Sequence, residues 1–356
     1  MRILHVDPER RWGGGQTQVM ALVRQLRAGG HESRLAAYPA GPLAQAAAAE
    51  GFPVVPLRIA NHVDLRAALA LRRLVGGHDV VHFHTARAHA LAPACRGLGA
   101  RLVVTRRMDY VPAGGPYVRF LYNHAVDAVI AISAGVRAAL LRVGVRADRI
   151  RVVPSGIDVG VAPPAGGGNV RAEWGIRPDE IAVVVPGVLE RRKGHAVLLA
   201  AAARLAPGGR RLRYVFCGDG TEAAALARSA AAASVAVRFA GFRTDMPACL
   251  AAADVVAMPS LMEGLGVAAL EAMAAKRPLV ASRVGGLGEV VVHEETGVLV
   301  PPGDPDALAM ALARLADDPA ARAHMGAAGR AHVLAHYTSA RMAAGTLACY
   351  GERPCV

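Results

Sequence analysis

The chain has 356 residues, 41 of them basic and 28 acidic, which gives a formal net charge of +13 at pH 7. Hydrophobic residues make up 53%, yet no apolar run approaches the roughly 20 residues that span a membrane, and no apolar signal segment precedes the first predicted strand. The five cysteines lack Cys-x-x-Cys spacing, which disfavours a disulfide framework or a zinc site.

Short apolar segments alternate with helical stretches along the whole chain. The strands we predict are Ile3–Val6, Val80–Phe83, Leu102–Thr105, Ala128–Ala131, Ile150–Val153, Ile181–Val185, Arg213–Cys217, Val235–Phe239, Asp254–Met258 and Pro278–Ala281. This alternation predicts an α/β fold with parallel sheets covered on both faces. A Pro/Gly-rich segment at 161–168 divides the series. We therefore expect two doubly wound, Rossmann-like domains, 1–162 and 163–337, whose strand ends face each other across a cleft.

A glycine-rich turn follows the first predicted strand. Gly13, Gly14 and Gly15 precede Gln16 and a helix with apolar residues at 19, 22, 23 and 26. Consecutive glycines at such a turn let the backbone approach a phosphate or a sugar closely. The pattern is not Gly-x-Gly-x-x-Gly, which argues against a dinucleotide-dependent dehydrogenase.

Polar residues close two further strands of the first half. His82 and His84 are two residues apart, and we expect them to face opposite ways, with only His84 reaching the cleft on the acceptor side; such a pair is poor geometry for one metal ion. Both could equally be structural. Arg107 offers a permanently charged, planar group for a phosphate or carboxylate on donor or acceptor. Asp109 could orient Arg107, accept a hydrogen bond from the acceptor hydroxyl, or form a local salt bridge.

The second half begins with a basic loop after its first strand, Arg191-Arg192-Lys193-Gly194. The chain has 39 Arg but only two Lys, so a lysine at this loop-to-helix junction is notable. Its compact ammonium suits a point contact with a diphosphate. Further along, Gly218 lies in a Gly-Asp-Gly turn, and Phe242 could stack on a base or belong to the core.

Two carboxylates flank a predicted helix start at Val267. Gly264 and Gly266 free the backbone there, and the unpaired amides of the first helical turn can point at an anion. Glu263 lies in the loop and Glu271 about one turn inside the helix. One carboxylate could therefore face the sugar of a bound molecule while the other binds hydroxyls further along it. Helices are also predicted at 305–316, 319–335 and 339–350.

The motif Glu263-Gly264-Leu265-Gly266-Val267-Ala268-Ala269-Leu270-Glu271 resembles the Glu-x7-Glu signature of retaining glycosyltransferases of family four, and similar landmarks run from about Ile3 to Asp306. The resemblance implies a GT-B fold and transfer of a hexosyl group from a nucleotide-diphosphate sugar with retention. It implies that Glu263 and the amides of Gly264, Leu265, Gly266 and Val267 contact the donor sugar and that Glu271 holds the ribose. It also suggests that the last helix, about 338–356, packs back on the first domain.

Other roles follow from the same resemblance. The loop at Gly14, Gly15 and Gln16 would close on the donor diphosphate, Lys193 would bind it, and Gly218 and Phe242 would lie near the nucleotide. Two positions depart from the family: Arg107 stands where many members have histidine beside the reacting sugar, and Val188 where they have arginine. We expect Arg192 or Arg191 to supply the missing charge.

These residues together predict charge stabilisation of a leaving diphosphate, with a UDP- or GDP-sugar as co-substrate and no cofactor or metal ion. The basic excess is uneven, because residues 1–160 carry 21 Arg against 10 acids. A basic first half of this kind favours binding to an acidic membrane surface. Aromatic residues make up only 4% of the chain, which gives poor support to nucleic-acid binding. We therefore expect a cytoplasmic protein, at the inner face of the membrane, with a glycan or lipid-linked acceptor in cell-envelope glycan biosynthesis.

Two alternatives remain open from the residues alone. One is a nucleotide-sugar epimerase of the same architecture, which would need an acid and a base facing the sugar. The other is a non-catalytic protein of this fold that binds membrane or nucleic acid. Incubation of the donor without acceptor tests the first, and binding that ignores nucleotide sugars would favour the second.

Overall fold

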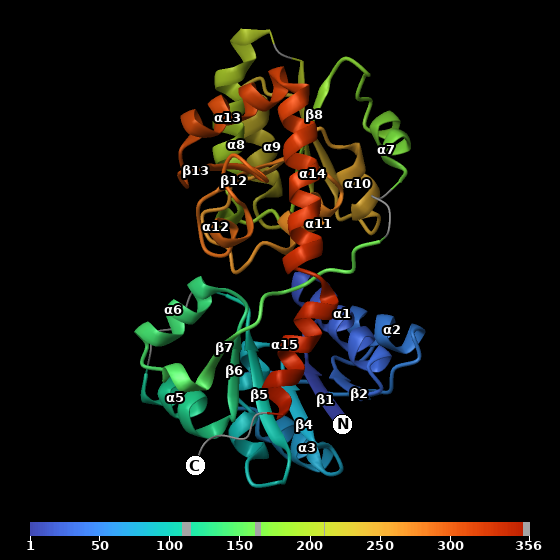
Figure 1. Cartoon of the computed structure of the whole chain (residues 1–356), viewed down its shortest axis with the longest axis vertical. Coiled ribbons are helices and arrows are strands. Elements are labelled where there is room, and N and C mark those ends of the chain that lie inside the picture. The colour runs from blue at the N-terminus through green and yellow to red at the C-terminus, as the bar shows by residue number, and fades with distance from the viewer. Residues whose placement is uncertain (109–114, 161–164, 210, 352–356) are drawn as a thin grey trace. The chain divides into compact units, whose positions relative to one another are not determined.

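The computed structural model describes residues 1–108, 115–160, 165–209 and 211–351 (Figure 1). Its chain forms two compact units, Met1–Asp158 with the segment from Thr338 onward, and Val159–Tyr337. We refer to them as unit 1 and unit 2. Each is an α/β unit around one parallel sheet, which confirms the predicted fold class.

Unit 1 contains a seven-stranded sheet of order β3-β2-β1-β4-β5-β6-β7. All its neighbouring strands pair in parallel. The strands are β1 (Arg2–Asp7), β2 (Glu32–Ala37), β3 (Val54–Pro56), β4 (Val80–Phe83), β5 (Arg101–Arg106), β6 (Ala128–Ala131) and β7 (Ile150–Val152). The helices are α1 (Gly14–Ala28), α2 (Pro42–Ala49), α3 (Leu65–Val75), α4 (Ala86–His89), α5 (Pro116–Phe120), α6 (Ala134–Arg142) and α15 (Ser339–Gly351).

Unit 2 contains a six-stranded parallel sheet of order β10-β9-β8-β11-β12-β13. The strands are β8 (Ile181–Pro186), β9 (Leu212–Cys217), β10 (Val237–Gly241), β11 (Val255–Met258), β12 (Leu279–Ser282) and β13 (Gly297–Val300). The helices are α7 (Gly167–Glu173), α8 (His195–Leu205), α9 (Ala223–Ala232), α10 (Met246–Ala252), α11 (Val267–Ala274), α12 (Leu287–Val290), α13 (Pro305–Asp317) and α14 (Pro319–His336). A single 3₁₀ turn, η4 (Arg191–Lys193), follows β8.

Every strand that we predicted is present, but β2, β3 and β13 were not predicted. β2 reads Glu-Ser-Arg-Leu-Ala-Ala, whose polar residues hide its strand character, and β3 is only three residues long. β13 starts at a glycine. β3 is an edge strand with no fully buried residue, unlike a central strand such as Ile-Ala-Val-Val-Val-Pro of β8. β13 is also an edge strand, but its Gly-Val-Leu-Val is buried throughout and is short rather than polar.

Helix α15 packs on α1 and completes the core of unit 1 (Figure 1). Met342 and Tyr350 of α15 lie in one buried cluster with Ile3 of β1 and Leu26 of α1. The side chain of Gln25 donates a hydrogen bond to the Ser339 hydroxyl over 3.0 Å. The last helix therefore belongs to the same hydrophobic core as the first strand.

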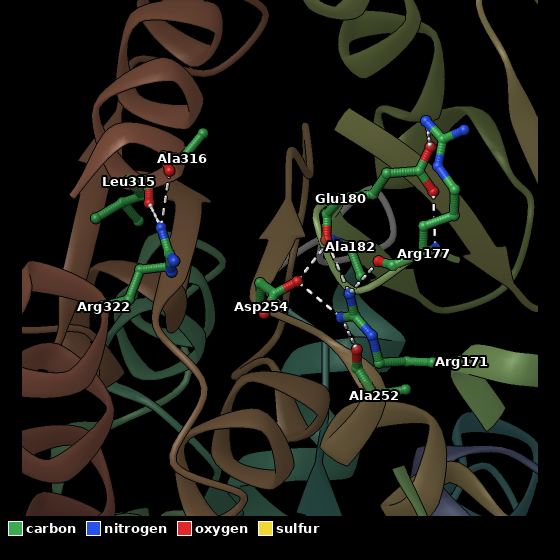
Figure 2. Close-up of polar contacts among 9 residues, drawn as sticks. All are labelled: Arg171, Arg177, Glu180, Ala182, Ala252, Asp254, Leu315, Ala316 and Arg322. Carbon is green, nitrogen blue, oxygen red and sulfur yellow. Dashed lines mark hydrogen bonds and ion pairs between the residues drawn. The ribbon is translucent and has the colours of Figure 1, made fainter. Parts of the chain in front are cut away.

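Arginine side chains in unit 2 hydrogen-bond backbone carbonyls and a carboxylate of neighbouring segments (Figure 2). Arg171 of α7 donates to the carbonyl of Ala252 and the carboxylate of Asp254, and that carboxylate also accepts from the amide of Ala182 at the start of β8. In the same view, Arg322 of α14 donates to the carbonyls of Leu315 and Ala316. These bonds satisfy the last carbonyls of α13, which an isolated helix leaves unpaired.

Candidate functional site

Strand order defines a switch point in unit 2. β8 has β9 on one side and β11 on the other, so the connections after β8 and β11 leave the sheet in opposite directions. Doubly wound sheets bind ligands at the carboxyl ends of the strands at such a point. The loop after β8 carries η4, and the loop after β11 carries Glu263 and the glycines before α11.

These two loops are held together by backbone contacts. The amides of Leu261 and Met262 donate to the carbonyl of Arg192 over 2.7 and 3.2 Å. Gly194 has φ +69°, and a Cβ there would clash with the carbonyl oxygen of Pro259. Only glycine both adopts this conformation readily and leaves room for Pro259.

Lys193 and Glu263 form an ion pair across the two loops. Their side chains are 14% and 10% exposed, and Ser260 also donates to the Glu263 carboxylate over 3.4 Å. The Lys193 side chain passes over Gly187, where a Cβ would lie 3.7 Å from Cε. Two residues that were predicted separately are therefore brought together at the switch point.

The start of α11 lies beside this pair. Gly266 caps the helix with φ +90°, in the left-handed region that favours glycine, and a Cβ there would press on Leu287 of α12. Gly264 accepts a hydrogen bond from the amide of Gly286 over 3.2 Å. The predicted helix start at Val267 is confirmed, and its first turn presents backbone amides next to Glu263.

Glu271 is half-buried in α11 and makes no side-chain hydrogen bond or ion pair with any described residue. Burial raises its pKa to about 7. An enclosed carboxylate without a donor is costly, and the hydroxyls of a ligand would relieve that cost.

The structure distinguishes the two loop arginines. Arg192 donates to Glu190 over 2.8 Å, so its charge is already paired. Arg191 is exposed and has no ion pair or side-chain hydrogen bond within the described chain. Of the two, Arg191 is the one available to an anion.

The loops after β9 and β10 form the side of the site towards the sheet edge. Gly218 has φ +159°, and a Cβ there would clash with the carbonyl of Gly187 after β8. Asp219 accepts a hydrogen bond from the amide of Phe242 over 3.1 Å. Phe242 is 57% exposed, so the alternative that it belongs to the core is wrong. Its ring is open for stacking.

Unit 1 has its own switch point, between β1 and β4. Helix α1 begins at Gly14, directly after β1 and its loop. The side chain of Gln16 donates to the buried carboxylate of Asp7 over 3.0 Å. A Cβ on Gly14 would meet no atom within 4 Å, whereas one on Gly15 would lie 3.8 Å from Cδ of Arg107. The glycine turn is thus open beside an arginine.

The expectation that His82 and His84 face opposite ways is wrong. Side chains on a strand alternate with period two, so residues two apart share a face. Their ring centroids lie 4.0 Å apart. His5 of β1 joins them, with Nδ1 3.0 Å from Nε2 of His84. Burial lowers the pKa of each of these imidazoles.

From the sequence we judged His82 and His84 to be poor geometry for one metal ion. The three histidines nevertheless have ligand atoms within 4.8 Å of one another, a spacing that admits a metal ion. However, His82 hydrogen-bonds the hydroxyls of Tyr350 and Thr105 over 2.7 and 2.6 Å. His5 contacts Ser33 and His84. These hydrogen bonds account for the cluster, and only Nδ1 of His84 has no partner in the described residues.

Asp109, predicted beside Arg107, lies outside the described residues. Two residues of these sites were missed. Asp7 directly follows the first predicted strand, Ile3–Val6, and ends β1 ahead of the glycine turn; that position could have revealed it. His195, the first residue of α8, is buried with neither ring nitrogen hydrogen-bonded in the described chain; a lone histidine after a glycine carries no sequence pattern that marks it.

Two doubly wound units with polar residues at their switch points have the architecture of GT-B proteins. A UDP-glucose complex of HepE from Anabaena superposes with a TM-score of 0.87 at 22% identity, covering 98% of this chain and 99% of that one. A Rickettsia africae glycosyltransferase superposes equally well at 19% identity, covering 98% and 97%.

Sequence comparison adds the family. Residues 168–332 match the model "Glycosyl transferases group 1", and residues 12–161 match "Glycosyltransferase Family 4". These two models together span most of the chain, which belongs to glycosyltransferase family four.

Curated relatives include an alpha-maltose-1-phosphate synthase from Mycolicibacterium smegmatis, 37% identical over 247 residues, which are 64% of this chain and 63% of the relative. A D-inositol 3-phosphate glycosyltransferase from Segniliparus rotundus is 37% identical over 211 residues, 57% of this chain and 47% of the relative. The chain thus matches about half to just under two thirds of their length. In the described residues, no helix is both long and apolar enough to cross a bilayer.

Proposed function

We propose that this protein is a retaining glycosyltransferase that moves a hexosyl group from a nucleotide-diphosphate sugar to a hydroxyl acceptor. Unit 2 binds the donor and unit 1 binds the acceptor. The observation that carries the proposal is the Lys193–Glu263 pair at the switch point of unit 2, beside the glycine-flanked start of α11. This arrangement offers a cation, backbone amides and a carboxylate to one ligand.

Each group has a separate task in this proposal. When the bond from the anomeric carbon to the diphosphate breaks, negative charge grows on the diphosphate. Lys193, Arg191 and the first amides of α11 stabilise that charge most where it is largest, in the transition state. Glu263, freed from Lys193 as the diphosphate arrives, binds hydroxyls of the donor sugar.

The nucleotide is held further along the same edge. The unpaired carboxylate of Glu271 accepts hydrogen bonds from the ribose hydroxyls. The turn at Gly218 lies near the nucleotide, and the exposed ring of Phe242 stacks on its base. HepE binds UDP and UDP-glucose, which supports a UDP-sugar here, with a GDP-sugar as the alternative donor.

A binding and transfer experiment tests this function. UDP and GDP are first compared by thermal shift, because a ligand that binds only the native state raises the melting temperature. Release of UDP from UDP-glucose is then followed with candidate acceptors, with and without EDTA. We expect acceptor-dependent release that EDTA leaves unchanged; interconversion of the donor sugar without acceptor would instead show an epimerase.

We further propose that the protein works at an acidic membrane surface on a glycan or lipid-linked acceptor. The support is the outer face of α3, where Leu65 and Leu69 are 77% and 58% exposed and Arg66 and Arg73 lie on the same face. Helix α3 contains no acidic residue. An exposed apolar stripe flanked by arginines suits the boundary between anionic head groups and acyl chains.

A further inference from the structure

Among the described residues Arg107 has no polar partner, although its side chain is largely enclosed. It follows β5 directly, at the carboxyl edge of the unit 1 sheet. Its guanidinium makes no hydrogen bond or ion pair with any described residue, and its Nε is shielded from solvent. Arginine stays charged at neutral pH, even though burial lowers this pKa to about 10. A guanidinium in such a place is suited to bind an anion.

The surroundings of Arg107 favour an anion. Its side chain lies beside Gly15 in the first turn of α1, a 15-residue helix with no acidic residue in that turn. The amides and dipole at that helix start attract negative charge. The neighbouring acid is Asp7, whose carboxylate is already bound by Gln16 and by the amide of Glu9. Burial raises the pKa of Asp7 to about 6, so at pH 7 this carboxylate is mostly ionised, but among the described residues it is bonded to Gln16 and Glu9 and not to Arg107.

A second unpartnered group lies within electrostatic range of Arg107. His84 follows β4, the strand next to β5, and it is 3% exposed with Nδ1 lacking a hydrogen bond in the described structure. Burial chiefly, and the charge of Arg107 among others, lower the pKa of His84 and keep its ring neutral. The His84 ring therefore adds no positive charge near Arg107, and the guanidinium supplies the charge that attracts an anion there.

We propose that unit 1 binds an acceptor that carries an oxyanion, either a phosphomonoester or a carboxylate, close to the hydroxyl that receives the sugar. Arg107 and the amides at Gly14 and Gly15 hold the oxyanion. This inference rests on the proposed transferase function and specifies its acceptor. The alternative occupant of Arg107 is the diphosphate of the donor, which the experiment below separates.

Binding is measured first, with UDP at saturation so that donor groups are occupied. Glucose, glucose 6-phosphate, glucuronate and inorganic phosphate are titrated by calorimetry into the wild type, Arg107→Gln and Arg107→Lys. The exposed Arg96→Gln in the same unit is the matched control. We expect an anionic probe to bind the wild type and Arg96→Gln, and to bind Arg107→Gln about 10- to 100-fold more weakly. Arg107→Lys should recover part of the affinity, because lysine keeps the positive charge but lacks the planar guanidinium that binds an oxyanion through two hydrogen bonds.

Three results would overturn the inference. In the first, the wild type with UDP bound shows no preference for an anionic probe over glucose. In the second, Arg107→Gln binds the anionic probes as tightly as the wild type does. In the third, Arg107→Gln would weaken UDP rather than the anionic probe, which would assign Arg107 to the donor. Unchanged UDP affinity in Arg107→Gln shows that the variant is folded. A wild type that does not bind any nucleotide contradicts the proposed function instead.

Discussion

The carboxylate of Glu271 is half-buried in α11 without a donor among the described residues, and its pKa is raised to about 7. The folded protein therefore keeps a proton on Glu271 between pH 4.5 and 7, where the unfolded chain has released it. Stability falls as the pH rises through that window, and the loss is complete above pH 7. A carboxylate that we propose for ligand binding thus lowers the stability of the free protein above pH 7.

We expect Glu271→Gln to remove that loss. Relative to the wild type, the variant should gain about 1 to 3 kcal/mol in free energy of unfolding between pH 5 and pH 8, measured by urea unfolding at both values. It should also bind UDP more weakly at pH 8. The exposed Glu32→Gln is the control and should show neither change; equal pH profiles for Glu271→Gln and wild type would contradict the idea.

A double-mutant cycle separates the contribution of the Lys193–Glu263 pair to stability from its contribution to sugar transfer. Lys193→Met and Glu263→Gln each leave a largely buried charge without its partner, and each should cost about 1 to 3 kcal/mol of stability. The double variant should recover part of that cost. Sugar transfer should fall by about 100-fold or more in all three variants. Retention of full transfer by either single variant would remove the pair from the mechanism.

At the scale of elements, the loop between η4 and α8 depends on one glycine. Gly194→Ala must accept φ +69° and also displace Pro259. We expect a loss of about 3 to 5 kcal/mol, measured by denaturant unfolding. Gly209→Ala is the control, since Gly209 has φ +65° with nothing within 4 Å. It should cost only about 1 to 2 kcal/mol for backbone conformation; similar losses would mean that the contact with Pro259 has little effect.

Helix α3 gives the membrane proposal its test. Leu65→Ser with Leu69→Ser should reduce flotation with vesicles containing phosphatidylglycerol by about 10-fold or more, because each leucine contributes about 1.5 to 3 kcal/mol when buried. The wild type should bind vesicles of phosphatidylcholine alone weakly. Met310→Ser in α13 is the control, since Met310 is equally exposed in unit 2. If the control loses as much binding, α3 is not the surface.

On the scale of the whole molecule, Tyr350 connects the end of the described chain to the sheet of unit 1. Its buried hydroxyl contacts Nδ1 of His82, whose Nε2 contacts Thr105 at the end of β5. Tyr350→Phe should cost about 1 to 3 kcal/mol, since it leaves a buried ring nitrogen unpaired. Tyr117→Phe, which removes a half-exposed bond to Ala90, should cost less in the same thermal unfolding measurement.

Much of this architecture could be predicted from the sequence, because buried parallel strands are continuous apolar runs and glycine turns mark their ends. Mixed composition conceals β2 and a length of three residues conceals β3, whereas β13 is a short apolar run that begins at a glycine. The switch-point loops were predicted, but the pairing of Lys193 with Glu263 joins residues 70 positions apart. The sequence does not show that Arg192 pairs with Glu190 while Arg191 has no partner in the described part of the chain. That His82 and His84 share a face was predictable, because side chains two apart on a strand point the same way.

The return of α15 to unit 1 has a consequence for synthesis of the chain. During synthesis β1 to β7 leave the ribosome first. The hydrophobic cluster that contains Ile3 and Leu26 remains incomplete until Met342 and Tyr350 have been synthesised. Unit 2 is complete by Tyr337 and can reach its native state earlier. The segment made first therefore matures last, and during elongation it exposes an apolar face on which chaperones would act.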